Sequence, residues 1–262
     1  MFRPFKIIRH LLTHRRIQRF WAGLASQAAT TPVDALREQR HQARQLRRHL
    51  DRVIQIAEDR LALPAIGSTA VHRPLGADWV WRPDPWRFAV AVPGQSSVPG
   101  QTTIGPAVQL FHDCRQSELT LRQVRNSRQS DLAPFGLRFD VFQFDGTFLS
   151  LVIELPELVC ADLKGRHVIR LDCTLDIEKP LEIYARLNLR QGPNVEQMVR
   201  SLPIPPQAAQ SYDTSVEFDL TYAKLDGRRI DRVWLDLILE GPELNQIVLR
   251  DITLSRRLRA DL

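Results

Sequence analysis

Between Leu119 and the C-terminus, apolar residues recur at every second position in eight separate runs. Because successive side chains of a strand point to opposite faces of a sheet, each run predicts a strand with one buried face. Turn residues separate the runs, and Asp145-Gly146 is a strong hairpin signal. The pattern predicts a mainly β fold, an antiparallel, jelly-roll-like β-sandwich over residues 107–262. The runs are Leu119/Leu121, Phe139/Val141, Leu149/Leu151/Ile153, Ile169/Leu171/Cys173/Leu175, Ile183/Ala185/Leu187/Leu189, Val216/Phe218/Leu220, Val233/Leu235/Leu237/Leu239 and Val248 onward.

The preceding segment, residues 62–106, is rich in proline and tryptophan. It contains seven prolines, a density that a helix cannot accommodate and that would remove ladder hydrogen bonds from an interior strand. We expect an extended strap that covers part of the sandwich. Its tryptophans, Trp79, Trp81 and Trp86, either offer a stacking platform for a sugar or base or pin the strap to the core, and the second role is favoured.

Positive charge is concentrated in residues 1–61, which we call the arm. Residues 1–60 hold 13 Lys and Arg against 5 Asp and Glu, whereas the whole chain holds 36 against 30, a net charge of +6. The rest of the chain is therefore slightly acidic. An anionic partner is expected to dock on the arm rather than on the sandwich.

The first residues of the arm have the spacing of an amphipathic helix over residues 2–14. Apolar residues share one face and basic residues occupy the other. Such a helix can lie in an anionic bilayer surface, although three arginines occupy the positions that would extend the apolar face. The alternative is packing on its own domain or on another subunit. The candidate membrane or partner contacts are Phe5, Ile8, Leu12, Arg15, Arg16 and Arg19.

A second helix is expected to start at Pro32, with Thr31 as its N-cap. Its apolar residues form a heptad seam with arginines between them. The seam must be buried, either in a homodimer through residues 32–61 or on the sandwich, and both remain open. Arginine clusters also suit nucleic acid, but no nucleic-acid-binding motif accompanies them, so a solvated face is favoured. The seam consists of Leu36, Ala43, Leu46, Leu50, Val53 and Ala57.

The cysteines and the apolar stretches indicate a reducing compartment. Cys114, Cys160 and Cys173 are odd in number and lack CxxC spacing, so free buried thiols are expected rather than disulfides or a zinc site. No uninterrupted apolar stretch is long enough for a secretory signal or a membrane span. The expected location is cytoplasmic, with any membrane contact peripheral at the inner membrane surface.

The side chains that alternate with the buried set are free to meet a ligand. On three predicted strands they include guanidinium, carboxylate and amide groups beside aromatic rings. Such groups form bidentate hydrogen bonds with vicinal hydroxyls, and a ring can lie under a sugar. Cross-strand ion pairs that keep a sheet face soluble need the same residues. The candidate ligand-binding residues are Arg170, Asp172, Tyr184, Arg186, Asn188, Arg190, Trp234 and Asp236.

Patterns for catalysis and for metal binding are weak throughout. His112 and Cys114 would share a strand face with their β-carbons well separated, which is poor geometry for a nucleophile and its base. Carboxylates such as Asp172 and Asp236 could flank a glycosidic bond, but the sequence does not give their separation. No glycine-rich phosphate loop occurs in the sequence. We predict no catalytic residue, no metal ligand and no cofactor.

Several short motifs resemble an uncharacterised alphaproteobacterial protein family of unknown function. The resemblance extends from about Arg60 to the end and brings no functional residues with it. The closing strand, Ile247 to Leu254, is similar to the last strand of galactose-binding-like jelly rolls, which implies carbohydrate binding and sometimes a structural calcium ion. The family motifs are Leu110-Phe111-His112-Asp113-Cys114-Arg115, Leu119 to Asn126, Arg186-Leu187-Asn188, Gly192-Pro193-Asn194, Trp234-Leu235-Asp236-Leu237 and Glu240-Gly241-Pro242-Glu243.

The strand series and the charge split favour a non-catalytic binding protein. Its sandwich would recognise a glycan or a protein partner, and its arm would attach it to a membrane surface or a partner. The alternative is an assembly module that works through the arm, by dimerisation or on an anionic surface, with a purely structural sandwich. A carboxylate-dependent, glycan-active enzyme is the third hypothesis.

Overall fold

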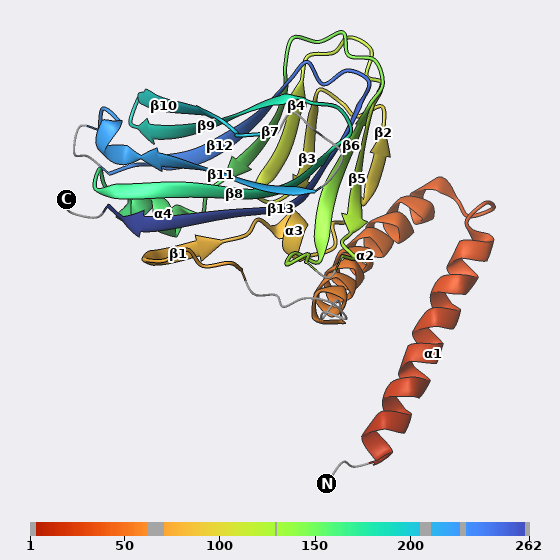
Figure 1. The fold of residues 1–262 in the computed structure, drawn as a ribbon. Coiled ribbons are helices and arrows are strands. Elements are labelled where there is room, and N and C mark those ends of the chain that lie inside the picture. The colour runs from red at the N-terminus through yellow and green to blue at the C-terminus, as the bar shows by residue number, and fades with distance from the viewer. Residues whose placement is uncertain (1–3, 62–70, 129, 205–210, 226–228, 260–262) are drawn as a thin grey trace. The chain divides into compact units, whose positions relative to one another are not determined.

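The computed structural model describes residues 4–61, 71–128, 130–204, 211–225 and 229–259. The chain forms two compact units, Met1–Ile54 and Gln55–Leu262 (Figure 1). The first unit is helical, and the second contains all the described strands. The expectation of a mainly β protein with a helical N-terminal arm is confirmed.

Two long helices make up the arm. α1 spans Pro4–Gln27, well past the expected end at His14, and α2 spans Val33–Leu61. The expected N-cap at Thr31 is wrong, because its hydroxyl donates to the carbonyl of Gln27, 2.9 Å away, and so closes the last turn of α1. None of the described helices is long and apolar enough to cross a membrane.

The apolar seam of α2 is only partly covered. Leu50 and Val53 are 51% and 64% exposed, whereas Leu46 is half-buried. The homodimer through residues 32–61 therefore stays a prediction. Of the candidate contacts on α1, Arg15, Arg16 and Arg19 are exposed, whereas Phe5, Ile8 and Leu12 have side chains outside the described residues.

Two antiparallel sheets form the sandwich (Figure 1). The seven-stranded sheet has the order β11-β8-β13-β6-β5-β2, with β1 also paired to β13, and the six-stranded sheet has the order β10-β9-β12-β7-β4-β3. Within the described residues, this unit also contains three short helical segments, α3 (Asp84–Arg87), α4 (Glu157–Asp162) and the 3-10 turn η1 (Leu220–Tyr222). The strands are β1 (Ala77–Trp81), β2 (Gly94–Ser96), β3 (Gln101–Gly105), β4 (Val108–His112), β5 (Leu119–Arg125), β6 (Phe135–Val141), β7 (Leu149–Glu154), β8 (His167–Ile177), β9 (Glu182–Gln191), β10 (Asn194–Ser201), β11 (Tyr212–Asp219), β12 (Arg232–Glu240) and β13 (Asn245–Leu258).

The core lies between the sheets and is built by the alternating residues. Leu151 of β7 and Leu171 of β8 are fully buried, and both belong to one continuous apolar cluster. Burying such a side chain stabilises the fold by about 1.5–3 kcal/mol, so the inward sets of both sheets hold the sandwich together. The cysteines are free thiols, with Cys160 and Cys173 buried and Cys114 partly exposed.

The proline-rich strap is part of the sandwich rather than a cover over it. It supplies β1, β2 and β3, each of which pairs on one side only, where proline-rich neighbours cost few ladder bonds. Trp86 is fully buried, and its indole N–H donates to the carbonyl of Leu249 at 2.8 Å. Trp79 and Trp81 stack with ring centroids 6.3 Å apart and pack against the core. The sandwich therefore begins at Ala77 rather than at residue 107, and the tryptophans pin the segment to it.

Candidate functional site

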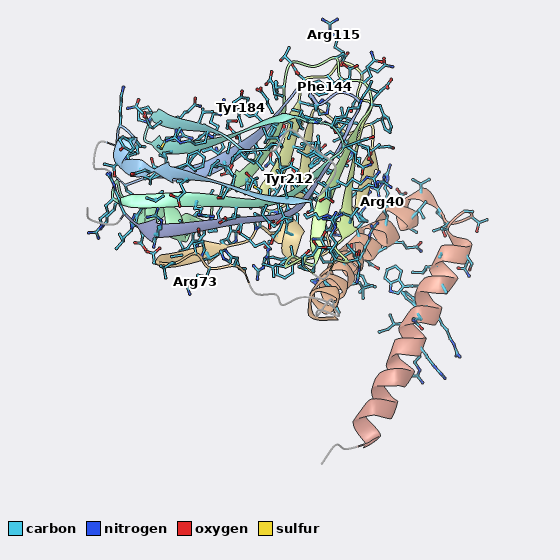
Figure 2. All side chains as sticks on the ribbon, viewed as in Figure 1. Arg40, Arg73, Arg115, Phe144, Tyr184 and Tyr212 are labelled. Carbon is cyan, nitrogen blue, oxygen red and sulfur yellow. The ribbon has the colours of Figure 1, made fainter. Side chains whose placement is uncertain are left out.

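The candidate ligand-binding residues do not share one face of the molecule. Arg170 and Asp172 lie on β8 of the seven-stranded sheet, whereas the other six lie on β9 and β12 of the six-stranded sheet. Both groups alternate with core residues of their strands, so they lie on the outer faces of different sheets, and Tyr184 is labelled on the six-stranded side in Figure 2. The expectation that these residues form one outer surface is therefore wrong. Alternation distinguishes inward from outward side chains, but it does not show which sheet a strand joins.

On the six-stranded sheet the polar candidates bond to one another. Asp236 accepts hydrogen bonds from Arg186 Nε at 2.8 Å and from Asn188 Nδ2 at 3.0 Å. Asn188 and Asp236 are only 1% and 3% exposed, and Gln197 donates to Asn188 Oδ1 at 3.1 Å. Arg190 donates to a turn carbonyl 3.2 Å away. Few hydrogen-bonding groups on this face are left for a ligand. This fits the alternative that the residues form cross-strand pairs that keep the sheet face soluble.

The aromatic candidates of this face are engaged as well. The Arg232 guanidinium lies 4.8 Å from the ring centroid of Trp234 and is paired with Glu154, so it covers one face of the indole. Tyr184 donates its hydroxyl to Glu182 Oε2 at 2.6 Å, and this bond raises the pKa of Tyr184. A sugar ring would have to displace these contacts before it could stack.

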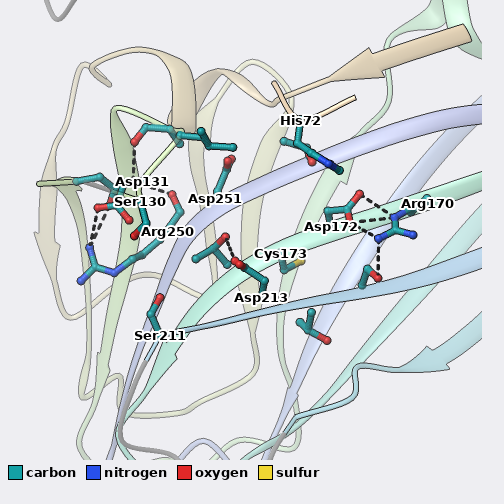
Figure 3. A pocket seen from close by; sticks show the side chains of 17 residues that line it. His72, Ser130, Asp131, Arg170, Asp172, Cys173, Ser211, Asp213, Arg250 and Asp251 are labelled. Atoms are coloured by element: carbon teal, nitrogen blue, oxygen red, sulfur yellow. Dashed lines mark hydrogen bonds and ion pairs between the residues drawn. The ribbon is translucent and has the colours of Figure 1, made fainter. Parts of the chain in front are cut away.

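A polar pocket opens on the outer side of the seven-stranded sheet (Figure 3). Its volume is about 500 Å³, and its walls come from β8, β11, β13, the loop between β5 and β6, and His72. Four aspartates, two arginines and six serines or threonines line it. Arg170 and Asp172, the two candidates on this sheet, are among them.

An irregularity in β13 brings two charged residues to the pocket. Leu249 and Ile252 are both buried in the core, so Arg250 and Asp251 lie between two inward positions. The register of β13 against β8 shifts between Leu249 and Asp251, as it does at a β-bulge. Because a bulge re-aims side chains, both charged residues line the same pocket.

The loop between β5 and β6 is fastened beside this bulge. Asn126 Nδ2 donates to the carbonyl of Arg250 at 2.8 Å and to two carbonyls near the start of β6. Arg128 makes two bonds to Asp176 of β8, and Arg250 pairs with the same carboxylate. Burial opposes the charge on Asp176, but hydrogen bonds from Arg128, Ser211 and Arg250 lower its pKa. Charged contacts therefore hold the loop wall in place.

A buried ion pair supports another wall of the pocket. Asp251 accepts hydrogen bonds from Arg82 Nε and Nη2, both at 2.7 Å, and Arg82 is 2% exposed. Burial raises the pKa of Asp251, an effect that Arg82 opposes and that the charge of Asp213 increases. The two parallel bonds fix the orientation of the carboxylate.

Arg170 and Asp172 form a pair along β8. Arg170 Nε donates to Asp172 Oδ1 at 2.9 Å, and its Nη2 donates to Ser215 Oγ of β11 at 3.0 Å. The bond to Asp172 raises the pKa of Arg170. These guanidinium donors are used within the protein, so carboxylate oxygens and hydroxyl groups are what the pocket offers to a ligand.

Asp213 of β11 keeps free hydrogen-bonding capacity. Its Oδ1 accepts the hydroxyl of Thr174 at 2.6 Å, its side chain is exposed, and no ion pair among the described residues includes it. It lies near Asp251 in the middle of Figure 3. Although the pocket is rich in carboxylates, no three His, Cys, Asp or Glu side chains in the described part of the chain are placed to hold a metal ion. The structural calcium ion implied by the fold likeness therefore stays a prediction.

Most of the pocket was not among the candidates from the sequence. Asp213 and Ser215 alternate with buried residues of β11, so the rule that identified β8 could have found them. The neighbouring charges Arg250-Asp251 interrupt the alternation of β13, which is the sequence signal of a bulge. The loop residues carry no such signal, because their place depends on bonds to distant strands.

The segment His112-Asp113-Cys114 has a structural role. One imidazole nitrogen of His112 lies 2.9 Å from the carbonyl of Val98, and the other accepts the backbone N–H of Cys114 at 3.2 Å. Asp113 accepts the hydroxyl of Thr147 at 2.6 Å, which lowers its pKa. Burial raises the pKa of the Cys114 thiol, which disfavours the nucleophilic thiolate.

Fold and pocket together define an antiparallel β-sandwich with a polar pocket on one outer face and a basic helical arm. A family model described as "Family of unknown function (DUF6478)" matches residues 1–262, and the chain belongs to this family. The resemblance to a family of unknown function is confirmed, whereas its alphaproteobacterial distribution stays a prediction. No curated protein matches the chain.

Solved structures with a similar fold share little sequence with this chain. The CBM22-1 xylan-binding domain from Paenibacillus barcinonensis Xyn10C has a TM-score of 0.38 at 7% identity, over 64% of this chain and 94% of the domain. The family 11 carbohydrate-binding module from Clostridium thermocellum has a TM-score of 0.36 at 14% identity, over 65% and 100%. The active domain of bacteriophage CBA120 tailspike protein 4 has a TM-score of 0.40 at 8% identity, over 59% of this chain but only 20% of the tailspike.

Proposed function

We propose that the sandwich is a non-catalytic module that binds a hydroxyl-rich ligand, a glycan, in the pocket of the seven-stranded sheet. The observation that carries this proposal is a space of about 500 Å³ lined mainly by aspartates, arginines, serines and threonines. Ligand sites commonly measure roughly 300–1,000 Å³. Polar groups from three strands and a loop converge on this space, as the recognition of several hydroxyls requires.

The balance of donors and acceptors favours a neutral glycan over an acidic one. The donors of Arg170 and Arg250 are bonded to neighbouring protein groups. Carboxylate oxygens remain, above all on Asp213, together with serine and threonine hydroxyls. Such oxygens accept hydrogen bonds from sugar hydroxyls, whereas an acidic sugar would bring a second negative charge to them.

The pocket carboxylates suit binding better than hydrolysis. Glycoside hydrolysis needs one carboxyl group that delivers a proton, opposite a second one across the scissile bond. Asp172 and Asp251 each accept bonds of 2.7 to 2.9 Å from a guanidinium. Both oxygens of Asp251 are engaged by Arg82, and burial raises its pKa, so these carboxylates are held by protein groups rather than free to act across a scissile bond.

A glycan array followed by titration calorimetry tests the proposal. We expect the parent protein to bind a neutral glycan and Asp213→Asn to weaken binding by tenfold or more, because a hydrogen bond to a charged group contributes about 1.5–3 kcal/mol. Glu240→Gln, which changes an exposed carboxylate of the six-stranded sheet, is the matched control and should bind like the parent. The pocket is excluded if the parent binds nothing or if both variants lose affinity equally. Release of reducing sugar from the bound glycan would indicate an enzyme instead.

For the arm, the proposal is attachment to a membrane surface or a partner. Its basic charge and its uncovered apolar residues, such as Phe20 and Val53, support this role. If the protein is instead an assembly module that works through the arm, removal of residues 1–61 should change the oligomer size in light scattering. Equal oligomer size with and without residues 1–61 would exclude assembly through the arm. The cytoplasmic location is likewise a proposal, supported by the free thiols.

A further inference from the structure

The helix α1 carries positive charge without compensation along its own length. It has five Lys and Arg residues and no Asp or Glu, whereas α2 has seven basic and five acidic residues. Arg15, Arg16 and Arg19 are exposed, and no ion pair between described residues includes them. The field of this helix therefore attracts an anionic partner.

An apolar stripe runs along the C-terminal half of the same helix. Ile17, Phe20, Trp21 and Leu24 follow i, i+3, i+4, i+7 spacing, which places them on one face. Phe20 is 59% exposed and Ile17 48%, and the rings of Phe20 and Trp21 meet edge to face with centroids 5.6 Å apart. This half of α1 is thus amphipathic in its own right, on residues that the periodicity of residues 2–14 did not include.

The stripe forms one side of a shallow apolar groove within the arm. Leu46 of α2 lines the groove together with Ile17, Phe20 and Trp21, over a volume of about 530 Å³. Arg16 also borders it, and nearly all the rest of its surface is apolar. An exposed apolar groove edged by a cation suits an acyl chain below a phosphate headgroup.

We propose that α1 docks on an anionic lipid bilayer, with the stripe and groove against the acyl chains and the arginines at the phosphates. Apolar surface and uncompensated cations on one helix are the two features that interfacial helices combine. A second copy of the chain could also fill the groove, but it would bring another acid-free α1 beside the first, and like charges repel. Charge complementarity therefore favours lipid. This makes the proposed attachment role of the arm specific and does not depend on the ligand of the pocket.

Co-sedimentation of the full-length protein with vesicles tests the charge requirement. We expect binding to vesicles of phosphatidylcholine with phosphatidylglycerol, little binding to phosphatidylcholine alone, and weaker binding at high salt because salt screens the attraction. Each basic residue near an anionic surface changes the binding constant about fivefold, so the triple variant Arg15→Gln, Arg16→Gln, Arg19→Gln should lose more than tenfold. Equal binding to both vesicle types would overturn the proposal.

A matched pair of phenylalanine variants tests the apolar requirement. Phe20→Ser should lower vesicle binding about tenfold, whereas Phe142→Ser, on a sandwich loop with a similar exposed fraction of 53%, should leave it unchanged. Equal loss in both variants would overturn the proposal. It would also be overturned if the parent protein binds no vesicles and forms a dimer that Phe20→Ser dissociates. Asp213→Asn should sediment like the parent, so that failure of the glycan proposal and failure of this one are read separately.

Discussion

The two outer faces of the sandwich use the same residue types but leave different amounts of space around them. On the six-stranded face, Asp236 lies directly opposite Arg186 in the strand register, and regular pairing lets the neighbours satisfy one another. On the seven-stranded face, the bulge at Arg250 and the loop after β5 interrupt this regularity beside a pocket of about 500 Å³. Polar composition alone therefore does not make a pocket; the irregular backbone does.

Two ion pairs, Arg82 with Asp251 and Arg232 with Glu154, differ in burial. The side chains of Arg82 and Asp251 are 2% and 13% exposed, whereas those of Arg232 and Glu154 are 50% and 28% exposed. Loss of one partner is costly for a buried pair because the other charge stays desolvated. An exposed pair contributes little. Substitutions in the two pairs should therefore differ in their effect on the free energy of unfolding, with a large loss for the pair beside the pocket and a small one for the exposed pair.

The largest effect is expected from Arg82→Ala. Asp251 would remain buried without its bidentate partner, so the free energy of unfolding should fall by about 3–5 kcal/mol. Urea denaturation followed by circular dichroism measures this change, and adding Asp251→Asn should recover part of the loss. A decrease below about 1 kcal/mol, the range of exposed pairs, would contradict the expectation that the buried pair contributes more to stability than the exposed one.

A pair of asparagine variants sharpens the comparison. Asn126→Ala removes the bonds that hold the pocket loop, and Asn188→Ala removes those of the six-stranded network. Each should cost about 1–3 kcal/mol of stability because buried partners lose a hydrogen bond. Only Asn126→Ala should also weaken glycan binding in calorimetry. The reverse result would place the ligand on the six-stranded face.

The strands could be predicted from the sequence because burial of one face is a local property. Leu171 of β8 and Leu187 of β9 are both fully buried, as alternation predicts. The same rule cannot show that β8 and β9, although consecutive in the chain, belong to different sheets. That choice depends on which strand each one pairs with, and a single sequence does not record pairing. For this reason alternation alone groups candidate residues from two different faces.

The pocket could not be predicted because its contacts join distant parts of the chain. Asn126 bonds to Arg250 across 124 positions, and Arg82 bonds to Asp251 across 169. The interruption at Arg250-Asp251 is visible in the sequence, but it indicates only an irregular strand. Whether the irregularity borders a cavity depends on the loop that Asn126 holds in place.

Acid should weaken the seven-stranded face through Asp176. Its pKa in the folded protein is lowered from 3.8 because the bonds from Arg128, Ser211 and Arg250 outweigh burial, so the unfolded chain takes up the proton first as the pH falls. This contribution to stability is complete above about pH 5 and is lost on acidification below about pH 4. Asp176→Asn should be less stable at neutral pH and should lose less stability on acidification. Identical slopes of the melting temperature against pH in both proteins would contradict the assignment.

The smallest effect is expected from Arg232→Ala on the six-stranded face. The exposed pair with Glu154 should contribute at most about 1 kcal/mol, so urea denaturation should show little change. The substitution also uncovers the indole of Trp234, over which the guanidinium lies at 4.8 Å. If the bonded network of Asp236 and Asn188 closes this face to ligands, glycan binding should stay at the parent level. A gain in affinity would show instead that the stacked arginine alone had kept an aromatic platform covered, and that both faces can serve as sites.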